Sequence, residues 1–232
     1  MKKIAILSDI HANRQALKAV LDDCKIEGVN AFWLLGDYVD YGASPIPVMH
    51  TLQTLTVEHA LAGNHEACLF NSDVKSSQTP HGLISYENTL RIFQQEPSQF
   101  EWVKTLQPMK LVNDTILLVH GTPEQPYWGK FLPSNNQEEI QSMFAYMEKE
   151  RLEYMFLGHS HISFMMTKNG RSIINPGSVG QPRNGYPLAQ YVVFDNGNIK
   201  FKKIPYDIDA AAEEIRVAKL PEYLWTRLFI GR

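Results

Sequence analysis

The first third of the chain consists of short apolar runs separated by polar turns. The runs at residues 4–7 and 31–35 are too short for buried helices and end at polar or glycine residues, which favours strands. Between them, Ala16, Leu17 and Val20 recur at helical spacing, with charged residues on the opposite face. This order predicts a strand, a helix and a second strand, and hence a parallel pair joined by a right-handed crossover.

The stretch from about residue 67 to 106 has a different pattern. Leu90, Phe93 and Trp102 are spaced as in helices, and polar residues at 76–77 and Pro97 interrupt the pattern. We therefore expect a small helical insertion here, at the edge of the sheet.

The second half of the chain becomes mostly strand. Asn113-Asp114, Asn169-Gly170 and Asn196-Gly197 each separate two strand-like runs, so each predicts a hairpin turn. Alternating β and α segments followed by paired strands predict an α/β fold of two packed sheets with helices outside, in one domain spanning residues 1–232. The further expected elements are strands at 56–61, 109–112, 115–119, 154–157, 164–167, 172–174, 191–194 and 199–204, and helices at 45–55, 138–151 and about 208–229, the last broken at Pro221.

Composition and charge narrow the class of protein. Hydrophobic residues make up 44% of the 232 positions and charged residues 20%, which is typical of a globular chain rather than a disordered or fibrous one. The formal net charge of −3 argues against a nucleic-acid polymer as partner, because such partners usually require a basic surface. Cys24 and Cys68 lie far apart without ligand-like spacing, which predicts buried thiols in a reducing compartment.

Nothing in the sequence indicates a membrane or secretory segment. The longest uninterrupted apolar run, 31–35, is far shorter than a membrane span. The apolar run after the two N-terminal lysines ends at Ser8-Asp9, too early for a signal peptide. We therefore expect a cytoplasmic protein that has no membrane partner.

Five predicted strands are each followed by polar residues of the type that bind metals, usually beside a glycine. These segments are Ser8-Asp9-Ile10-His11, Gly36-Asp37, Gly63-Asn64-His65-Glu66, His120-Gly121 and Gly158-His159-Ser160-His161. A single aspartate or histidine at such a place is usually a cap or an ordinary core residue. Together, however, the segments hold five of the chain's eight histidines, and the carboxyl ends of strands in open α/β sheets form the binding crevice.

The residue types in these segments indicate the metals that they would bind. Aspartate, asparagine and histidine without a thiolate select divalent ions such as Mn²⁺, Fe²⁺, Zn²⁺, Co²⁺ or Ni²⁺. The candidate ligands are too numerous for one tetrahedral zinc. They suit two metals that share a bridging carboxylate, an arrangement used to hydrolyse phosphate esters.

The motifs D-x-H, G-D, G-N-H-E, H-G and G-H-x-H, in this order between Asp9 and His161, resemble those of the calcineurin-like metallophosphoesterase superfamily. The segment 175–180 resembles a further motif common in bacterial members. The resemblance covers nearly the whole chain and implies a four-layer α/β/β/α sandwich of two mixed sheets flanked by helices. The start of the chain, D-I-H-A-N at 9–13, looks closest to small bacterial and archaeal phosphodiesterases.

The resemblance implies a role for each matching residue. The ligands of the first metal are expected to be Asp9, His11 and His161. Those of the second are expected to be Asn64, His120 and His159, with Asp37 bridging the two metals. His65 is expected to act as general acid for the leaving oxygen, oriented by Asp40.

The implied reaction is in-line attack on phosphorus by a metal-bridging hydroxide, with manganese the first expectation for both ions and Fe, Zn, Co or Ni the alternatives. Two dications and two aspartates leave an inner shell of about +2, which would attract a phosphoryl group and stabilise its developing charge. The metals would also acidify the attacking water. No protein nucleophile is then needed.

The substrate expected from the resemblance is a small phosphate ester or nucleotide. Related phosphoprotein phosphatases carry one arginine directly after the extended motif G-D-Y-V-D and another directly before G-N-H-E. Here G-D-Y-V-D spans 36–40, but Tyr41 follows Asp40 and Ala62 precedes Gly63, so both arginines are missing. This favours a phosphodiesterase or nucleotide pyrophosphohydrolase, with dinucleoside polyphosphates among the possible substrates. A phosphomonoesterase or protein phosphatase, and a non-catalytic metal-binding scaffold of the same fold, remain as alternatives.

A few further residues are candidates for substrate contacts. Arg183, after the glycine-rich turn at 177–180, could bind phosphate, and Asn13 could donate a hydrogen bond near the first metal or cap the following helix. Side chains that could face the site or stack a base, but that are more simply explained by packing, are Tyr41, Tyr86, His81 and Trp128. The helical insertion and the C-terminal helices could each form a homo-oligomer interface.

Overall fold

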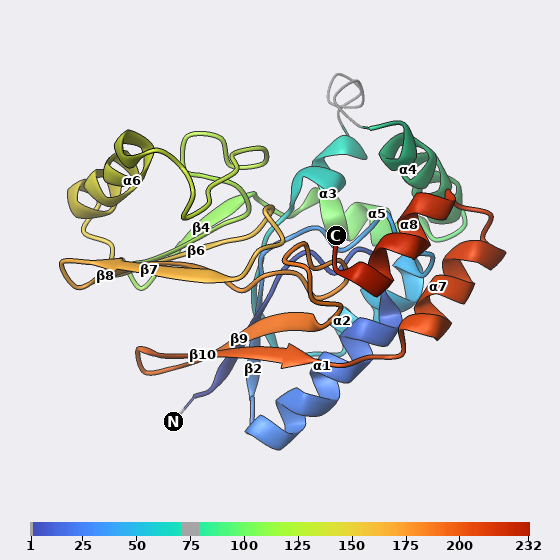
Figure 1. Ribbon diagram of the computed structural model, residues 1–232, viewed down its shortest axis with the longest axis horizontal. Coiled ribbons are helices and arrows are strands. Elements are labelled where there is room, and N and C mark those ends of the chain that lie inside the picture. Colours follow the sequence, from blue (N-terminus) through green and yellow to red (C-terminus); the bar gives the residue numbers. More distant parts are fainter. Residues whose placement is uncertain (1, 71–78) are drawn as a thin grey trace.

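Two five-stranded mixed sheets pack face to face, and helices cover the outer face of each (Figure 1). The computed structural model describes residues 2–70 and 79–232. The first sheet has the order β10-β9-β1-β2-β3, and its strands are β1 (Ile4–Leu7), β2 (Ala31–Leu34), β3 (Val57–Ala60), β9 (Ala189–Asp195) and β10 (Asn198–Ile204). The second has the order β4-β5-β6-β8-β7, and its strands are β4 (Met109–Val112), β5 (Ile116–Val119), β6 (Tyr154–Leu157), β7 (Phe164–Lys168) and β8 (Arg171–Asn175).

The strand alternation assigns side chains to separate apolar layers. In β1, Ile4 and Ile6 belong to the core between the two sheets, whereas Ala5 and Leu7 belong to the core under the outer helices. The strand β5 also buries side chains on both faces. Leu118 belongs to the core between the two sheets, and Leu117 belongs to the core on the outer face of the second sheet. Burial on both faces explains why these strands are continuously apolar. The α/β/β/α sandwich predicted from the sequence is therefore confirmed.

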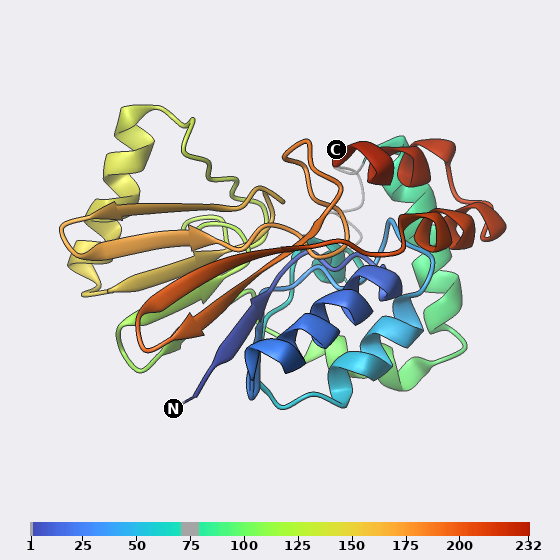
Figure 2. The same ribbon diagram turned by 60° about the horizontal axis from the view of Figure 1, so that its bottom comes forward.

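The helices begin and end where sequence signals place them. Asn13 caps α1 by accepting a hydrogen bond from the Ala16 N–H, and Gly28 ends it in the left-handed conformation at φ 71°. Figure 2 shows α1 and α2, in blue and light blue, side by side on the outer face of the first sheet. The helices are α1 (Arg14–Glu27), α2 (Pro45–Gln53), α3 (Asn64–Cys68), α4 (Pro80–Phe93), α5 (Pro97–Lys104), α6 (Gln137–Lys149), α7 (Ile208–Val217) and α8 (Glu222–Thr226), followed by a 3-10 turn, Arg227–Ile230.

The predicted hairpin turns are confirmed by their backbone conformation. Asn113, Asn169 and Asn196 all have positive φ, at 49°, 51° and 49°, and Gly170 and Gly197 follow with φ of 76° and 83°. Two consecutive left-handed residues are the requirement of the two-residue turn that suits twisted strands. Asparagine and glycine tolerate this conformation, so the turn sequence fixes the strand pairing locally.

The expected insertion at about 67–106 corresponds to α4 and α5, which bury Tyr86, Phe93 and Val103 in the core on the outer face of the first sheet. The polar break expected at 76–77 lies outside the described residues, which resume at 79.

The assignment of the whole chain to one domain stays a prediction. Cys24 and Cys68 are both buried thiols, as expected, and neither forms a disulfide with a described residue. None of the helices in the described ranges is long and apolar enough to cross a bilayer.

We predict that Glu27→Gln makes stability less dependent on acid pH. Glu27, at the end of α1, accepts hydrogen bonds from Lys200 and Lys202 of β10, and these bonds lower the pKa of Glu27 to about 2 from its usual 4.5. Because the pKa of Glu27 is lower in the folded protein, its carboxylate stabilises the folded state fully above about pH 4.5, and this stabilisation is lost as the pH falls toward 2. Thermal unfolding should show the wild type and variant differing near neutral pH and converging in acid.

The exposed change Glu101→Gln, whose partner Lys104 lies on the same helix, is the control for removing a charge and should alter the pH dependence less. A constant gap between wild type and Glu27→Gln from pH 7 to 2 would show that this carboxylate does not tie α1 to β10.

Candidate metal centre

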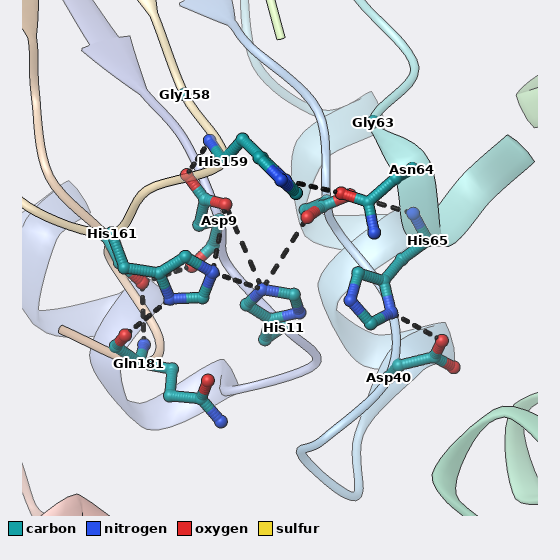
Figure 3. A network of polar contacts seen from close by, with 12 residues as sticks. Asp9, His11, Asp40, Gly63, Asn64, His65, Gly158, His159, His161 and Gln181 are labelled. Carbon is teal, nitrogen blue, oxygen red and sulfur yellow. Dashed lines mark hydrogen bonds and ion pairs between the residues drawn. The ribbon is translucent and has the colours of Figure 1, made fainter. Parts of the chain in front are cut away.

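The candidate ligands converge because the strands that precede them run parallel. The strands β1, β2 and β3 are neighbours and parallel, and so are β5 and β6 in the facing sheet. Parallel strands end at the same edge, so the five sequence segments that follow them meet in one place. Figure 3 shows Asp9, His11 and His161 pointing toward one another, with Asn64 and His159 close by. The sequence prediction that these segments converge is confirmed.

Six of the residues at this edge have a left-handed backbone. They are Asp9, His11, Asp37, Asp40, His159 and His161, with φ between 48° and 63°. This conformation costs roughly 1–2 kcal/mol for each residue that has a Cβ atom. Such strain persists only where the surrounding structure imposes it, and it concentrates at functional sites. The chain therefore gives up stability in order to point these side chains inward.

One group of possible ligands consists of Asp9, His11, Asp37 and His161, all buried, with one ligand atom from each lying within 4.8 Å of the others. The Nε2 atom of His161 lies 3.2 Å from Oδ1 of Asp9. The Nε2 atom of His11 lies 3.8 Å from Oδ2 of Asp37 and 4.0 Å from Oδ1 of Asp9. Both carboxylates and both imidazoles therefore border the same small volume.

The orientation of the two histidines in this group suits a cation. The Nδ1 atom of His11 donates to the Val39 carbonyl at 3.0 Å, and that of His161 donates to the Gln181 carbonyl at 2.6 Å. A carbonyl can only accept, so Nδ1 carries the proton and the neutral ring presents a lone pair at Nε2. These two Nε2 atoms lie 3.2 Å apart (Figure 3). Two facing lone pairs repel each other unless a cation or a proton lies between them.

A second group shares Asp37 with the first and adds His120 and His159. The Nε2 atom of His120 lies 3.3 Å from Oδ2 of Asp37, while its Nδ1 donates to the Leu35 carbonyl at 2.7 Å. The amide oxygen of Asn64 lies 3.0 Å from Nε2 of His120 and 2.8 Å from Nδ1 of His159. An oxygen and two imidazole nitrogens thus meet beside Asp37.

Burial and charge act on these histidines in a way that favours ligation. Burial, then the charges of His65 and His161, lower the pKa of His11, and burial followed by the charge of His120 lowers the pKa of His159 to about 3. The neutral form that can bind a metal therefore prevails in both. Burial also opposes a proton on His120, but the charge of Asp37 outweighs it and raises the pKa of His120 to about 9. The buried carboxylates thus attract positive charge, for which a proton and a metal compete.

His65 lies beside the two groups and has a separate partner. Its Nδ1 atom lies 2.7 Å from Oδ2 of Asp40 in a buried pair, and its ring contacts those of His11 and Tyr41. Burial alone would lower the pKa of His65, but Tyr41, Asp37 and Asp40 together raise it well above its usual range. The ring can therefore hold a proton next to the candidate ligands.

Two further residues, whose roles the sequence did not reveal, position Asp37. The carboxylate of Glu66 accepts the backbone N–H groups of Asp37, Tyr38 and Gly63 at 2.7–2.8 Å, and so ties the loop after β2 to the start of α3. A Cβ atom at Gly63 would lie 2.0 Å from Oδ1 of Asp37. The available sequence signal was glutamate at the third position of a short helix, the capping-box position.

The groups open onto a cavity of about 150 Å³. Its lining residues are Asp37, Tyr41, Asn64, His65, Thr79, Gly82, Trp128, His159, His161 and Arg183. Among the sequence candidates for substrate contact, Arg183, Tyr41 and Trp128 are thus at the cavity. A larger hollow of about 390 Å³ between the 122–131 loop and α6 has none of the candidate ligands in its wall.

The remaining sequence candidates lie elsewhere. Asn13 uses its side-chain oxygen to cap α1 and donates from its amide nitrogen to the Gly180 carbonyl at 3.0 Å, and it is not in the wall of this cavity. His81 is exposed and stacks on Tyr223 at 5.1 Å. Tyr86 is buried in the core under the outer helices. The role of Asn13 as a substrate contact stays a prediction.

The residues present fit a divalent metal. Oδ1 of Asp9 is buried, and its neighbour Nε2 of His161 is the unprotonated nitrogen of that ring, so among the described residues no hydrogen bond reaches this oxygen. An unpartnered buried carboxylate oxygen is costly unless a cation or a donor meets it. Oxygen and imidazole donors without thiolate suit borderline divalent ions. The donors and their arrangement therefore indicate divalent-metal binding, while the distribution of ligands between two ions stays a prediction.

Comparison with known proteins agrees with this chemistry. The model of the calcineurin-like phosphoesterase superfamily domain matches residues 1–198. An uncharacterized protein of Methanocaldococcus jannaschii, MJ0912, is 32% identical over 248 residues, which cover 99% of this chain and 98% of the relative. The crystal structure of a metallophosphoesterase from Sphaerobacter thermophilus is 30% identical, with a TM-score of 0.84 over 99% of this chain and all of that one. The hypothetical protein PH1004 of Pyrococcus horikoshii, 20% identical, shares the fold with a TM-score of 0.86 over 100% of this chain and 99% of that one.

We predict that Asp37→Asn weakens the binding of divalent cations at both groups of ligands. The substitution keeps the size of the side chain but removes the charge that both groups share. We expect the affinity for Mn²⁺ to fall at least about tenfold, since loss of even an outer partner of a ligand typically costs that much. Isothermal titration with Mn²⁺ measures both affinity and stoichiometry.

The control is Asp114→Asn, an exposed position in a hairpin turn whose left-handed conformation suits asparagine. This variant should bind Mn²⁺ like the wild type. Wild-type affinity and stoichiometry in Asp37→Asn would rule out the shared role of Asp37.

Proposed function

The chain belongs to the calcineurin-like phosphoesterase superfamily, and on that basis we propose that it hydrolyses phosphoric esters with two divalent cations, of which manganese is the first candidate and Fe, Zn, Co or Ni the alternatives. The substrate that we propose is a small phosphodiester or a nucleotide with a phosphoanhydride bond. The formal net charge of −3 supports a small ligand rather than a nucleic-acid polymer.

The observation that carries this proposal is the sharing of Asp37 by two groups of candidate ligands. One carboxylate shared by two sets of candidate ligands suits a pair of neighbouring cations. Asp9, His11 and His161 would hold one cation with Asp37, and Asn64, His120 and His159 would hold the other. When bound, the cations supply positive charge to the phosphoryl oxygens and a water acidic enough to attack phosphorus near neutral pH.

The protein's own groups complete the reaction at the leaving oxygen. Asp40 engages Nδ1 of His65, so Nε2 is the nitrogen left for the cavity that this ring lines. The carboxylate of Asp40 stabilises the protonated ring and fixes its orientation. His65 would then give its proton to the oxygen that departs from phosphorus, as a general acid. Arg183, a cationic side chain in the cavity wall, would contact the substrate.

The shape of the cavity supports the choice of substrate class. The ring of Tyr41 lies 4.6 Å from that of His11 and 4.7 Å from that of His65, at the position after Asp40 where related phosphoprotein phosphatases carry an arginine. A volume of about 150 Å³ is too small for a whole nucleotide, so the rest of such a substrate would extend outward from the phosphoryl group. These features favour a diester or nucleotide over a phosphorylated protein side chain.

We expect the protein, purified without chelator and supplied with Mn²⁺, to hydrolyse bis-p-nitrophenyl phosphate or diadenosine tetraphosphate faster than p-nitrophenyl phosphate. The three compounds separate a diesterase, a nucleotide pyrophosphohydrolase and a monoesterase. EDTA should abolish the activity and added Mn²⁺ should restore it. Preference for p-nitrophenyl phosphate would replace this proposal with a monoesterase, and no turnover of any compound would indicate a non-catalytic metal-binding scaffold.

We predict that His65→Ala lowers kcat by roughly 10²–10⁴-fold, the usual contribution of general acid–base catalysis, without loss of Mn²⁺ binding. The loss should be larger for an alkyl phosphodiester than for a p-nitrophenyl ester, because a nitrophenolate leaves without needing a proton. Steady-state rates on both esters, with Mn²⁺ titration of the variant, make the test. His50→Ala, at an exposed position on α2, is the matched control. Equal losses on both esters would contradict the acid role.

A further inference from the structure

The segment after residue 198, which the family model does not cover, meets the metal centre through one buried arginine. Arg227 lies at the start of the 3-10 turn that follows α8, and its side chain is 8% exposed overall. Its guanidinium lies 4.8 Å from the ring centre of Tyr223 and 5.9 Å from that of Tyr41. Because Tyr41 contacts the rings of His11 and His65, a single aromatic ring separates this cation from the candidate ligands.

A second arginine reaches the same region from the loop after β8. The backbone N–H of Arg183 donates to the His161 carbonyl at 3.1 Å, and its Nη2 donates to the Gln181 side chain at 2.9 Å. Gln181 also accepts from Nδ1 of His161 through its carbonyl, so one residue positions both a candidate ligand and the arginine. Nε of Arg183 is buried and has no hydrogen-bond partner among the described residues.

The two arginine-bearing segments are fixed to each other. The N–H of Gly185 donates to the carbonyl of Gly231 at 2.9 Å. Gly231 has φ 62°, and a Cβ atom there would lie 2.6 Å from the backbone of Tyr186. In Figures 1 and 2 the C-terminal helices lie beside α4, where His81 stacks on Tyr223. The turn that carries Arg227 is therefore held against the loop that carries Arg183.

These two cations lack acidic partners in the described part of the chain. No aspartate or glutamate side chain there forms an ion pair with either arginine, and Nε of Arg227 donates to the main-chain oxygen of Arg232. Burial, and then the nearby charge of Arg183, lower the pKa of Arg227. Two cations brought together repel each other, and an anion bound beside both relieves that repulsion. Two guanidinium groups are well suited to bind phosphate oxygens.

We propose that Arg183 and Arg227 form an anion subsite beside the metal centre, and that it selects phosphate esters with a second anionic group next to the scissile phosphorus. The inference rests on the proposed function and deepens it, because it names the preferred substrate class as nucleoside polyphosphates and their esters rather than singly charged diesters. Arg183 contacts the second group directly from the cavity wall. Arg227 is a positioning residue that adds charge from behind Tyr41.

The test compares two substrates with the same leaving group at constant free Mn²⁺. They are the p-nitrophenyl ester of thymidine monophosphate and the γ-p-nitrophenyl ester of thymidine triphosphate, which differ in the phosphates next to the scissile phosphorus. The wild type should prefer the triphosphate ester. Arg183→Gln and Arg227→Gln should each lower kcat/KM for that ester about tenfold or more, mainly through KM, and should lower kcat/KM for the monophosphate ester by a clearly smaller factor.

Matched variants separate this effect from a loss of structure. Arg216→Gln removes the same charge from an exposed arginine that pairs with Glu213 on its own helix. This variant should leave kcat/KM unchanged for both esters. Arg227→Lys keeps the charge and should retain more of the preference than Arg227→Gln. Where Arg227→Gln unfolds, as circular dichroism would show, Arg183→Gln and Arg227→Lys decide the question.

The outcomes distinguish the subsite from the proposed function. A wild type that hydrolyses neither ester with Mn²⁺ refutes the proposed function itself. A wild type that hydrolyses both without preference, or variants that lose the same factor on both, refutes the subsite alone.

Discussion

The convergence of two buried carboxylates, Asp9 and Asp37, on one small volume is the constraint on which the rest of this structure depends. Each buried charge without compensation costs several kcal/mol, and here the charges lie among imidazoles that are needed in their neutral form. A cation at this place lowers the free energy of the carboxylates and of the facing Nε2 atoms of His11 and His161 at once. The polar cluster is therefore consistent only with a site that attracts positive charge.

The same constraint explains features that would otherwise reduce stability. The left-handed backbone at six site residues turns their side chains inward at the ends of the strands. The energy for this comes from the surrounding sandwich, whose inter-sheet core includes Trp33, Phe156 and Phe194 in mutual contact. Glu66 then locks the loop after β2 onto α3. Rigid strands and the buried Glu66 carboxylate thus fix the positions of the site residues.

Much of this arrangement could be predicted from the sequence because it depends on local signals. Short apolar runs predicted the strands, and the asparagine-containing turns predicted the hairpins. The convergence of the candidate ligands followed from one rule, that parallel strands end at a common edge. The contributions of Glu66 and Arg227 could not be predicted in this way. Glu66 acts through backbone groups of a loop 28 residues away, and Arg227 reaches Tyr41 only because the C-terminal turn packs against the 183–186 loop.

The central claim is that two cations share Asp37. Anomalous diffraction from crystals grown with Mn²⁺ tests this most directly, because it locates each ion without assuming its ligands. The account predicts two anomalous peaks about 3.5–4 Å apart, the usual spacing of paired metal sites, with the Asp37 carboxylate in contact with both. A single peak, or two peaks of which only one touches Asp37, would contradict it.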